Sequence, residues 1–349
     1  MSTVTTDAAT RLLLLFRRAA FAAAALTFVV IVASAFMRHT QAGLACDDWP
    51  ACYGRIVASA ADGAPGTEPA SSTGVRLARI AHRLAATSVL ALVIGLLLVA
   101  WTQKPAWQRG GFLAAAALVV AGGLAVLGIA TPGAMLPAVT LGNLLGGYLL
   151  LALLVATYAS ATRESSVRPS ADIGEAPRPV AHALDAAERV AVSAPNDLSR
   201  WIAVAALVVA FAQAWLGGTI GAQYALTACP TLGRCPGIAF DAVVASSAFD
   251  PFRPLSVAGG RVVPPADAAG VHVAHRVLGI VVAFMALIVA NGLRRFAARA
   301  ARLLVASAIA APLLGAAAIL ALPSLPLAVL HNAAAAFTIA ALAAAAARR

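Results

Sequence analysis

Charged residues are scarce in this chain of 349 residues: Asp, Glu, Lys and Arg together make up 11% of it, and only 14 residues are acidic. A soluble globular domain carries about 25% charged residues, so the shortage excludes an ordinary soluble fold. Apolar side chains take their place, with 61% hydrophobic residues and a mean hydropathy of +0.88. We therefore expect an integral membrane protein.

Eight apolar stretches rich in Ala, Leu and Val are each long enough to cross a bilayer, which takes about 20 helical residues. They cover residues 19–37, 78–101, 111–130, 138–158, 201–220, 271–293, 303–322 and 326–346. None of the 14 acidic residues falls inside them. The predicted fold is all-α, with eight transmembrane helices forming two tandem four-helix bundles.

The chain divides near its middle, where residues 160–200 lose hydrophobicity and gain Pro, Ser and mixed charge. We interpret this segment as a cytoplasmic linker between an N-terminal half, residues 1–159, and a C-terminal half, residues 201–349. Four spans return the chain to the side from which it started. The halves are therefore expected to run parallel, related by a pseudo-twofold axis along the membrane normal.

The positions of Lys and Arg predict the orientation in the membrane. With both termini inside, the inner segments carry most of the 25 basic residues, as cytoplasmic loops usually do. Attraction to an anionic inner leaflet is enough to explain the net charge of +11, so no nucleic acid is needed as a partner. The first apolar stretch is long and lacks a convincing cleavage site, so we expect a span rather than a cleaved signal.

The two halves repeat one motif, in which two cysteines with five residues between them are followed by Ala-His-Arg at the start of a span. The copies are Cys46, Cys52, His82 and Arg83 in the first half, and Cys229, Cys235, His275 and Arg276 in the second. A histidine inside a bilayer is costly and usually marks function. The repeat therefore indicates a bound metal or cofactor.

A second segment repeats at the far end of each half, where residues 136–143 align with residues 325–332. This alignment places Gly142 opposite His331. The second half thus has two histidines, His275 and His331, on different helices at similar depth. A six-coordinate heme takes its axial ligands from opposite faces, which separate helices can supply, so this pair is the best candidate for heme ligation.

The other polar residues near the spans allow two readings each. Arg83 and Arg276 either bind heme propionates or extend to the outer interface, and the duplication favours the propionates. His272 is either a proton relay or, as we favour, a polar residue at a helix start. His39, directly after the first span, is expected at the membrane interface.

The cysteine pairs fit an oxidising exterior, where close pairs in loops persist as disulfides. We expect Cys46–Cys52 and Cys229–Cys235 to staple outer loops, with a redox relay to an external thiol oxidoreductase as the sharper alternative. A zinc site is less favoured, because the pairs belong to separate repeats.

The segment AlaGlyLeuAlaCysAspAspTrpProAlaCysTyrGly at 42–54, AlaHisArg at 81–83 and 274–276, and LeuHisAsn at 330–332 resemble bacterial heme A synthase of the CtaA group. The resemblance implies an oxidoreductase that converts the C8 methyl group of heme O to the formyl group of heme A for cytochrome oxidase. It also implies heme b on His275 and His331, and substrate heme on His82.

The resemblance further implies a multi-pass protein of the bacterial inner membrane, with periplasmic cysteine loops and a complex with heme O synthase. The electron donor is not identified by the sequence, and a homo-oligomer is left open.

Two positions depart from the family pattern. Arg79 replaces a glutamate that many members carry three residues before the first His-Arg, and Gly142 replaces a histidine. We hypothesise that His82 holds the substrate heme on one face, with the other face open or contacted by Asn143. One alternative is a non-catalytic heme-binding paralogue for oxidase assembly or electron transfer. Another is a quinone-linked thiol–disulfide enzyme, which would leave the repeated histidines unexplained.

Overall fold

The computed structural model describes residues 2–41, 73–102, 108–130, 135–167, 197–233, 235, 246–295, 297–321 and 324–347. Long helices make up most of them: α1 Ser2–Gln41, α2 Thr73–Thr102, α3 Gln108–Ala130, α4 Pro137–Val167, α6 Asp197–Ala222, α8 Ala268–Leu293, α9 Ala298–Leu320 and α10 Leu325–Ala347. Cys46, Cys52 and residues 168–196 of the expected linker lie outside the described residues. Helix α4 continues beyond residue 160, where the linker was expected to begin.

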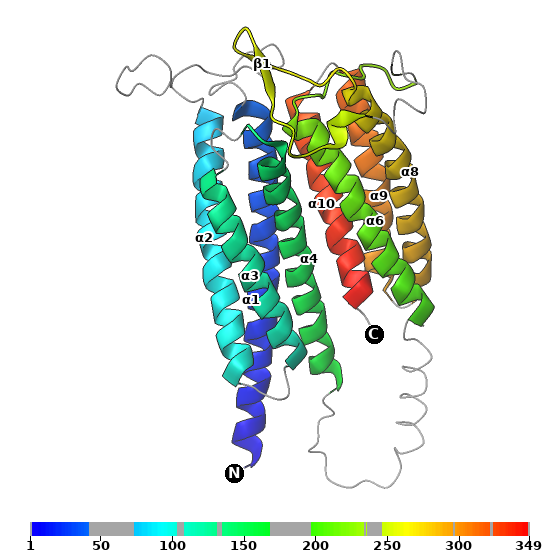
Figure 1. Cartoon of the computed structure of the whole chain (residues 1–349). Coiled ribbons are helices and arrows are strands. Elements are labelled where there is room, and N and C mark those ends of the chain that lie inside the picture. Colours follow the sequence, from blue (N-terminus) through cyan, green and yellow to red (C-terminus); the bar gives the residue numbers. More distant parts are fainter. Residues whose placement is uncertain are drawn as a thin grey trace, which may run out of the picture.

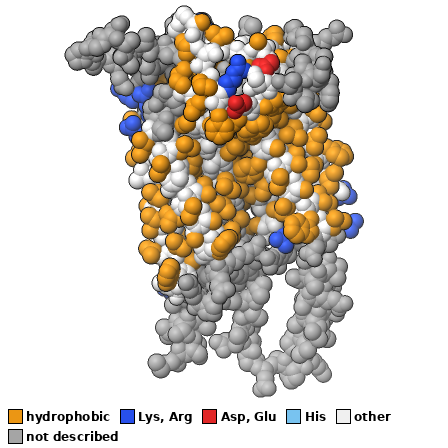
Figure 2. All heavy atoms as spheres, in the orientation of Figure 1, with side chains coloured by type: hydrophobic (Ala, Val, Ile, Leu, Met, Phe, Trp, Pro, Cys, Tyr) orange, Lys and Arg blue, Asp and Glu red, His pale blue; other side chains and the backbone are white. Residues whose placement is uncertain are grey.

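All eight predicted spans are confirmed as helices long and apolar enough to cross a membrane. None of these spans contains Asp or Glu. Figure 2 shows hydrophobic side chains covering the middle of one face, with Lys and Arg towards its two ends. On α3 the exposed residues Phe112, Val119 and Val126 recur every seven positions, which puts them on one helix face. An exposed apolar stripe of this kind is suited to contact with lipid.

Each half forms its own group of four helices. Helix α1 packs against α2 and α4, and α3 packs against the same two, so that α2 and α4 lie diagonally opposite. In the second half α6 and α9 each contact both α8 and α10. The two groups meet through α1, α4, α6 and α10. Figure 1 shows both chain termini near one end of the bundle and a β-hairpin at the other, which we call the hairpin end.

The hairpin is the part of the described fold that the all-helical prediction missed. Strand β1, Ser256–Ala258, pairs antiparallel with β2, Arg261–Val263. The turn between them consists of Gly259 and Gly260, with φ of +58° and +72°. Two consecutive positive φ angles are what a two-residue type I′ turn needs, and glycine adopts them without a Cβ clash.

The segment before α8 reaches across from the second half to the first. The Ala138 N–H, in the first turn of α4, donates to the Pro251 carbonyl at 2.8 Å. The Leu255 N–H donates to the Met135 carbonyl at 2.8 Å. The first N–H groups of a helix have no partner within it. The second half thus satisfies a backbone donor of the first.

Candidate functional site

Two histidines face each other inside the second half, near the hairpin end. The ring centroids of His275 on α8 and His331 on α10 lie 6.0 Å apart, with the ring planes 75° to each other. Each lies seven residues before a buried position, Val282 and Thr338 respectively. Residues seven apart share a helix face, so both side chains belong to inward faces. The structure therefore brings together the pair singled out from the sequence.

The His331 ring is oriented by a backbone carbonyl on α9. Its Nδ1 lies 2.7 Å from the Ala311 oxygen and donates to it as Nδ1–H. This bond fixes the tautomer and leaves Nε2 as the nitrogen with a lone pair. Gly315 makes the approach feasible, because a Cβ there would lie 3.0 Å from both Cε1 and Nδ1 of His331.

The His275 ring lies against a glycine of α6 in the same way. A Cβ at Gly217 would lie 2.7 Å from His275 Cε1, closer than real Cβ atoms approach other heavy atoms. Gln213, one turn earlier on α6, places its Nε2 3.5 Å from His275 Nε2. His275 Nδ1 is buried and has no hydrogen-bond partner among the described residues. The ring is thus enclosed by helix contacts without being committed to a short hydrogen bond.

This arrangement fits two axial ligands of a heme. Two metal–nitrogen bonds of about 2 Å each would separate the ligating nitrogens by about 4 Å, and rings with centroids 6.0 Å apart can supply such nitrogens. Within the described part of the chain, no three His, Cys, Asp or Glu side chains converge as a ligand set. A metal held by these two histidines therefore needs its other ligands from elsewhere, as a porphyrin provides.

The arginine next to His275 binds the cysteine loop. Arg276 Nη1 donates to the carbonyls of Thr231 at 2.7 Å and Leu232 at 3.1 Å, and Nη2 donates to the Cys229 carbonyl at 3.0 Å. Cys229 and Cys235 form a disulfide with Cα atoms 5.0 Å apart, which confirms that predicted bond. The structure therefore shows a contact that neither earlier reading of Arg276 included.

His272 is a structural residue at the start of α8, as favoured from the sequence. It is 3% exposed, and its Nε2 lies 2.7 Å from the Ala225 carbonyl, to which it donates. This bond ties the start of α8 to the segment after α6.

The first half has a different arrangement at the matching positions. His82 on α2 lies seven residues before the buried Val89, so it belongs to the inward face. Where the second half has His331, the first has Gly142, and a Cβ there would lie 2.7 Å from Leu127 Cδ2. Arg83 is exposed, and Asn143 is half-buried on α4. An apolar contact between α3 and α4 thus takes the place of a second histidine.

A polar cluster between the halves was missed by the sequence analysis. Arg38 Nη2 on α1 donates to Asn332 Oδ1 on α10 at 2.9 Å, and Asn332 directly follows His331. His39 is 5% exposed and lies within electrostatic range of Arg38 and His331, so its side chain is buried among the helices. Helix α1 extends through Gln41, beyond the apolar stretch predicted from the sequence, and so includes both residues. The sequence signal that could have pointed to this cluster is Arg38, a basic residue directly after the apolar stretch 19–37.

Two titratable groups lie in the loops at the hairpin end. Desolvation alone would raise the pKa of the Asp267 carboxyl, but hydrogen bonds to its Oδ2 from the Ser247 hydroxyl and the Ser247 N–H are the main effects that outweigh it and hold this pKa below its ordinary value. Burial raises the pKa of the Tyr224 phenol, with a smaller opposing effect from Arg38. Tyr224 also has a φ of +53°, an unusual conformation for a residue with a side chain.

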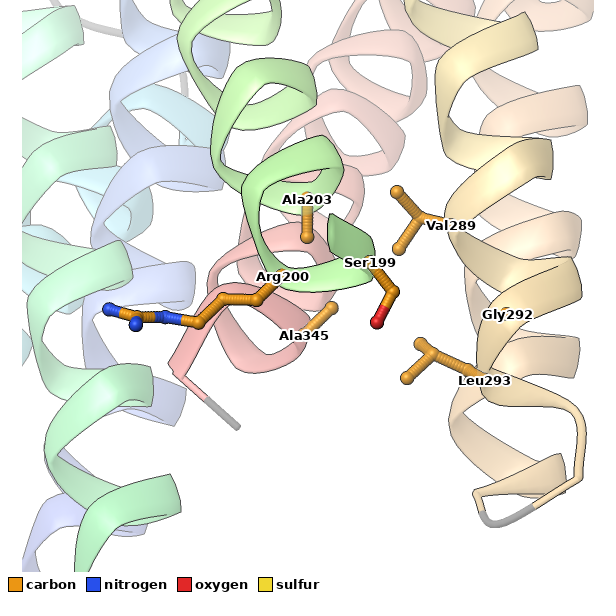
Figure 3. A pocket seen from close by; sticks show the side chains of 7 residues that line it. All are labelled: Ser199, Arg200, Ala203, Val289, Gly292, Leu293 and Ala345. Carbon is orange, nitrogen blue, oxygen red and sulfur yellow. The ribbon is translucent and has the colours of Figure 1, made fainter. Parts of the chain in front are cut away.

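Two recesses lie away from the histidine pair. One is lined by residues at the start of α6 and the end of α8, with Ala345 of α10, and Figure 3 shows Arg200 pointing away from Val289 and Leu293. It is distant from His275, because the 18 residues from His275 to Leu293 span about 27 Å of helix. The other, of about 220 Å³, lies at the hairpin end beside Gln223 and Arg253. Neither includes a histidine ligand candidate.

Comparison with known proteins gives one positive result. A family profile described as "COX15-CtaA: Cytochrome oxidase assembly protein" matches residues 17–343. A search of curated proteins finds no match.

Proposed function

The chain belongs to the COX15-CtaA family of cytochrome oxidase assembly proteins, and on that premise we propose that it is a heme A synthase that oxidises the C8 methyl group of heme O to a formyl group. Membership implies heme A synthesis for cytochrome oxidase and therefore involvement of heme. The geometry supports a division of labour between the two halves, with substrate chemistry in the first and electron delivery in the second.

The single observation that carries the proposal is the facing pair His275 and His331, whose ring centroids lie 6.0 Å apart. We propose that this pair holds heme b. Bis-histidine heme supplies reversible one-electron transfer. The chain's own part is to fix the ligands: Ala311 accepts from His331 Nδ1, and Gly217 leaves room for the His275 ring.

In the first half, His82 would bind heme O as substrate on one face. The matching position on α4 is Gly142, so the opposite face would have no second histidine from this position and would be left open or contacted by Asn143. An open position suits oxygen activation. Since no span contains Asp or Glu, protons in this half must exchange with water or with groups at the hairpin end.

Arg83 is exposed on α2 and remains available to bind a propionate of the substrate heme. Arg276 donates from both Nη atoms to loop carbonyls. If Arg276 also binds a propionate, it would have to use the guanidinium N–H groups that do not donate to these carbonyls.

The proposal includes the arrangement in the cell. The halves 1–159 and 201–349 would be related by a pseudo-twofold axis along the membrane normal, in the bacterial inner membrane, with the termini cytoplasmic and the hairpin end periplasmic. Heme O synthase is the proposed supplier of substrate.

Co-expression with heme O synthase tests the function. Membranes containing the protein should yield heme A on chromatography of extracted heme, and the purified protein should show a low-spin Soret spectrum. Membranes expressing heme O synthase alone are the control. A folded protein that takes up no heme even when hemin is supplied would overturn the proposal.

One observation favours a second candidate, a non-catalytic heme-binding paralogue for oxidase assembly or electron transfer. The close approach of Leu127 to Gly142 shows that the first half lacks the second histidine position. The same co-expression decides between them, because a paralogue would bind heme but leave heme O unaltered.

A further inference from the structure

One arginine crosses the boundary between the halves and reaches the neighbour of a proposed heme ligand. Arg38, near the end of α1, donates from Nη2 to Asn332 Oδ1 at 2.9 Å. Asn332 Nδ2 donates in turn to the Ala328 carbonyl of its own helix at 2.9 Å. The amide is therefore oriented by two bonds, one from each half, directly after His331.

Space for the guanidinium comes from the opposite half. A Cβ at Gly221 on α6 would lie 3.4 Å from Arg38 Nε. Arg38 and Gly221 are equivalent in the repeat, because each stands eight residues before the first cysteine of its half, Cys46 or Cys229. Equivalent positions thus meet at the boundary, and only the first half supplies a side chain. Of these two equivalent positions, only the one in the first half therefore carries a positive charge.

The side chains within electrostatic range of this charge are buried or half-buried. Tyr148, which is 2% exposed, Tyr224 and His39 all lie within electrostatic range of the guanidinium. Charges interact more strongly in such a low-dielectric setting than in water. His39 also lies within electrostatic range of His331, so it links the guanidinium to the histidine pair. A redox centre held by that pair would experience the Arg38 charge as a longer-range interaction through this buried region.

We propose that Arg38 is a positioning residue that sets the redox potential of the heme held by His275 and His331, an inference that rests on the proposed function. Its positive charge favours the ferrous form, which carries one positive charge fewer than the ferric form. Its hydrogen bond to Asn332 holds α10 in register with α1. Through this residue the first half sets how readily the second half gives up an electron.

Spectroelectrochemical titration of the purified, heme-loaded full-length protein tests this. Arg38→Gln should lower the midpoint potential so that the ferric-to-ferrous ratio at a given potential rises about tenfold, a shift of about 59 mV for a one-electron couple. The low-spin spectrum should be unchanged. Arg38→Lys keeps the charge and should shift the potential less. Arg18→Gln is the matched control, because Arg18 is exposed on the same helix, about 30 Å away.

If Arg38→Gln is not recovered folded, Asn332→Asp tests the same charge from the other side, because a carboxylate beside the guanidinium should lower the potential. An unchanged potential in heme-loaded Arg38→Gln or Asn332→Asp overturns the inference. A wild-type protein that binds no heme would instead overturn the proposed function, so the two failures are distinguishable.

Discussion

Two glycines of the second half make room for histidines, whereas two glycines of the first half make room for leucines. Gly217 and Gly315 lie against the rings of His275 and His331, while Gly142 and Gly146 lie against Leu127 and Leu124. Glycine allows close approach of helices in membranes. Close approach at glycine thus accommodates two candidate ligands in the second half and an apolar contact between helices in the first. The halves share a helix plan but differ in what their small residues accommodate.

We expect the largest effect, loss of low-spin heme, when one candidate ligand of the second half is removed. His331→Ala should abolish the low-spin heme signal and lower the heme content by about one per chain, because a single imidazole cannot supply both axial ligands. Electron paramagnetic resonance and a pyridine hemochrome assay measure this. The same signal should persist in His82→Ala, and a full low-spin signal in His331→Ala would refute the assignment.

Removing the histidine of the first half should have the opposite signature. His82→Ala should reduce heme A in co-expressing membranes by at least about tenfold, since even groups that only support a metal ligand are worth that much. The low-spin heme of the second half should remain. Undiminished heme A would remove His82 from the catalytic site.

The glycines provide a matched set of four substitutions. Gly217→Ala and Gly315→Ala push on the imidazoles and should weaken heme binding by about tenfold, as other disturbances of ligand support do. Gly142→Ala and Gly146→Ala press on the side chains of Leu127 and Leu124 and not on an imidazole, so they should cost about 1 kcal/mol of stability and leave the low-spin spectrum intact. Heme titration and thermal unfolding separate the two effects. Equal heme loss in all four variants would show that the halves do not differ in this respect.

The two His-Arg pairs can be compared through their arginines. Arg276→Lys should speed reduction of Cys229–Cys235 severalfold, because hydrogen bonds from a charged group are worth about 1.5–3 kcal/mol and these are partly solvent-exposed, which reduces their value. Thiol labelling with peptide mapping follows this disulfide specifically. Arg83→Lys is the control and should leave its rate unchanged. If the two variants behave alike, the carbonyl contacts do not protect the disulfide.

The smallest effect concerns pH and is confined to the loop before α8. The Asp267 pKa is lowered in the folded protein, so its hydrogen bonds with Ser247 contribute stability above the unfolded value of about 3.9 and lose it as pH falls through the lower folded value. Amide hydrogen-exchange protection factors of residues 246–258, which are corrected for the intrinsic pH dependence of exchange, should therefore fall modestly on acidification from pH 6 to pH 3. Asp267→Asn should flatten this dependence, and a persistent dependence would assign it to another group.

Hydropathy was sufficient to predict the helices, because each span is a continuous apolar stretch. The internal repeat was sufficient to select His275 and His331. Aligning the two halves shows that His275 has a counterpart in the first half, whereas the position equivalent to His331 is Gly142. The role of Gly217 could not be predicted, because it appears only when α6 is placed beside α8 and the chain has 27 glycines. Arg38 likewise has the sequence context of an interfacial cation, and only the contact with Asn332 reveals its place between the halves.

The bond from Ala138 to Pro251 also bears on how the polypeptide is made. A ribosome releases the first four spans well before residue 251 has been synthesised. The opening turn of the fourth span must then rely on water, or on the insertion machinery, to bind its amide. The first turn of α4 therefore completes its backbone hydrogen bonding only after the later half has been translated.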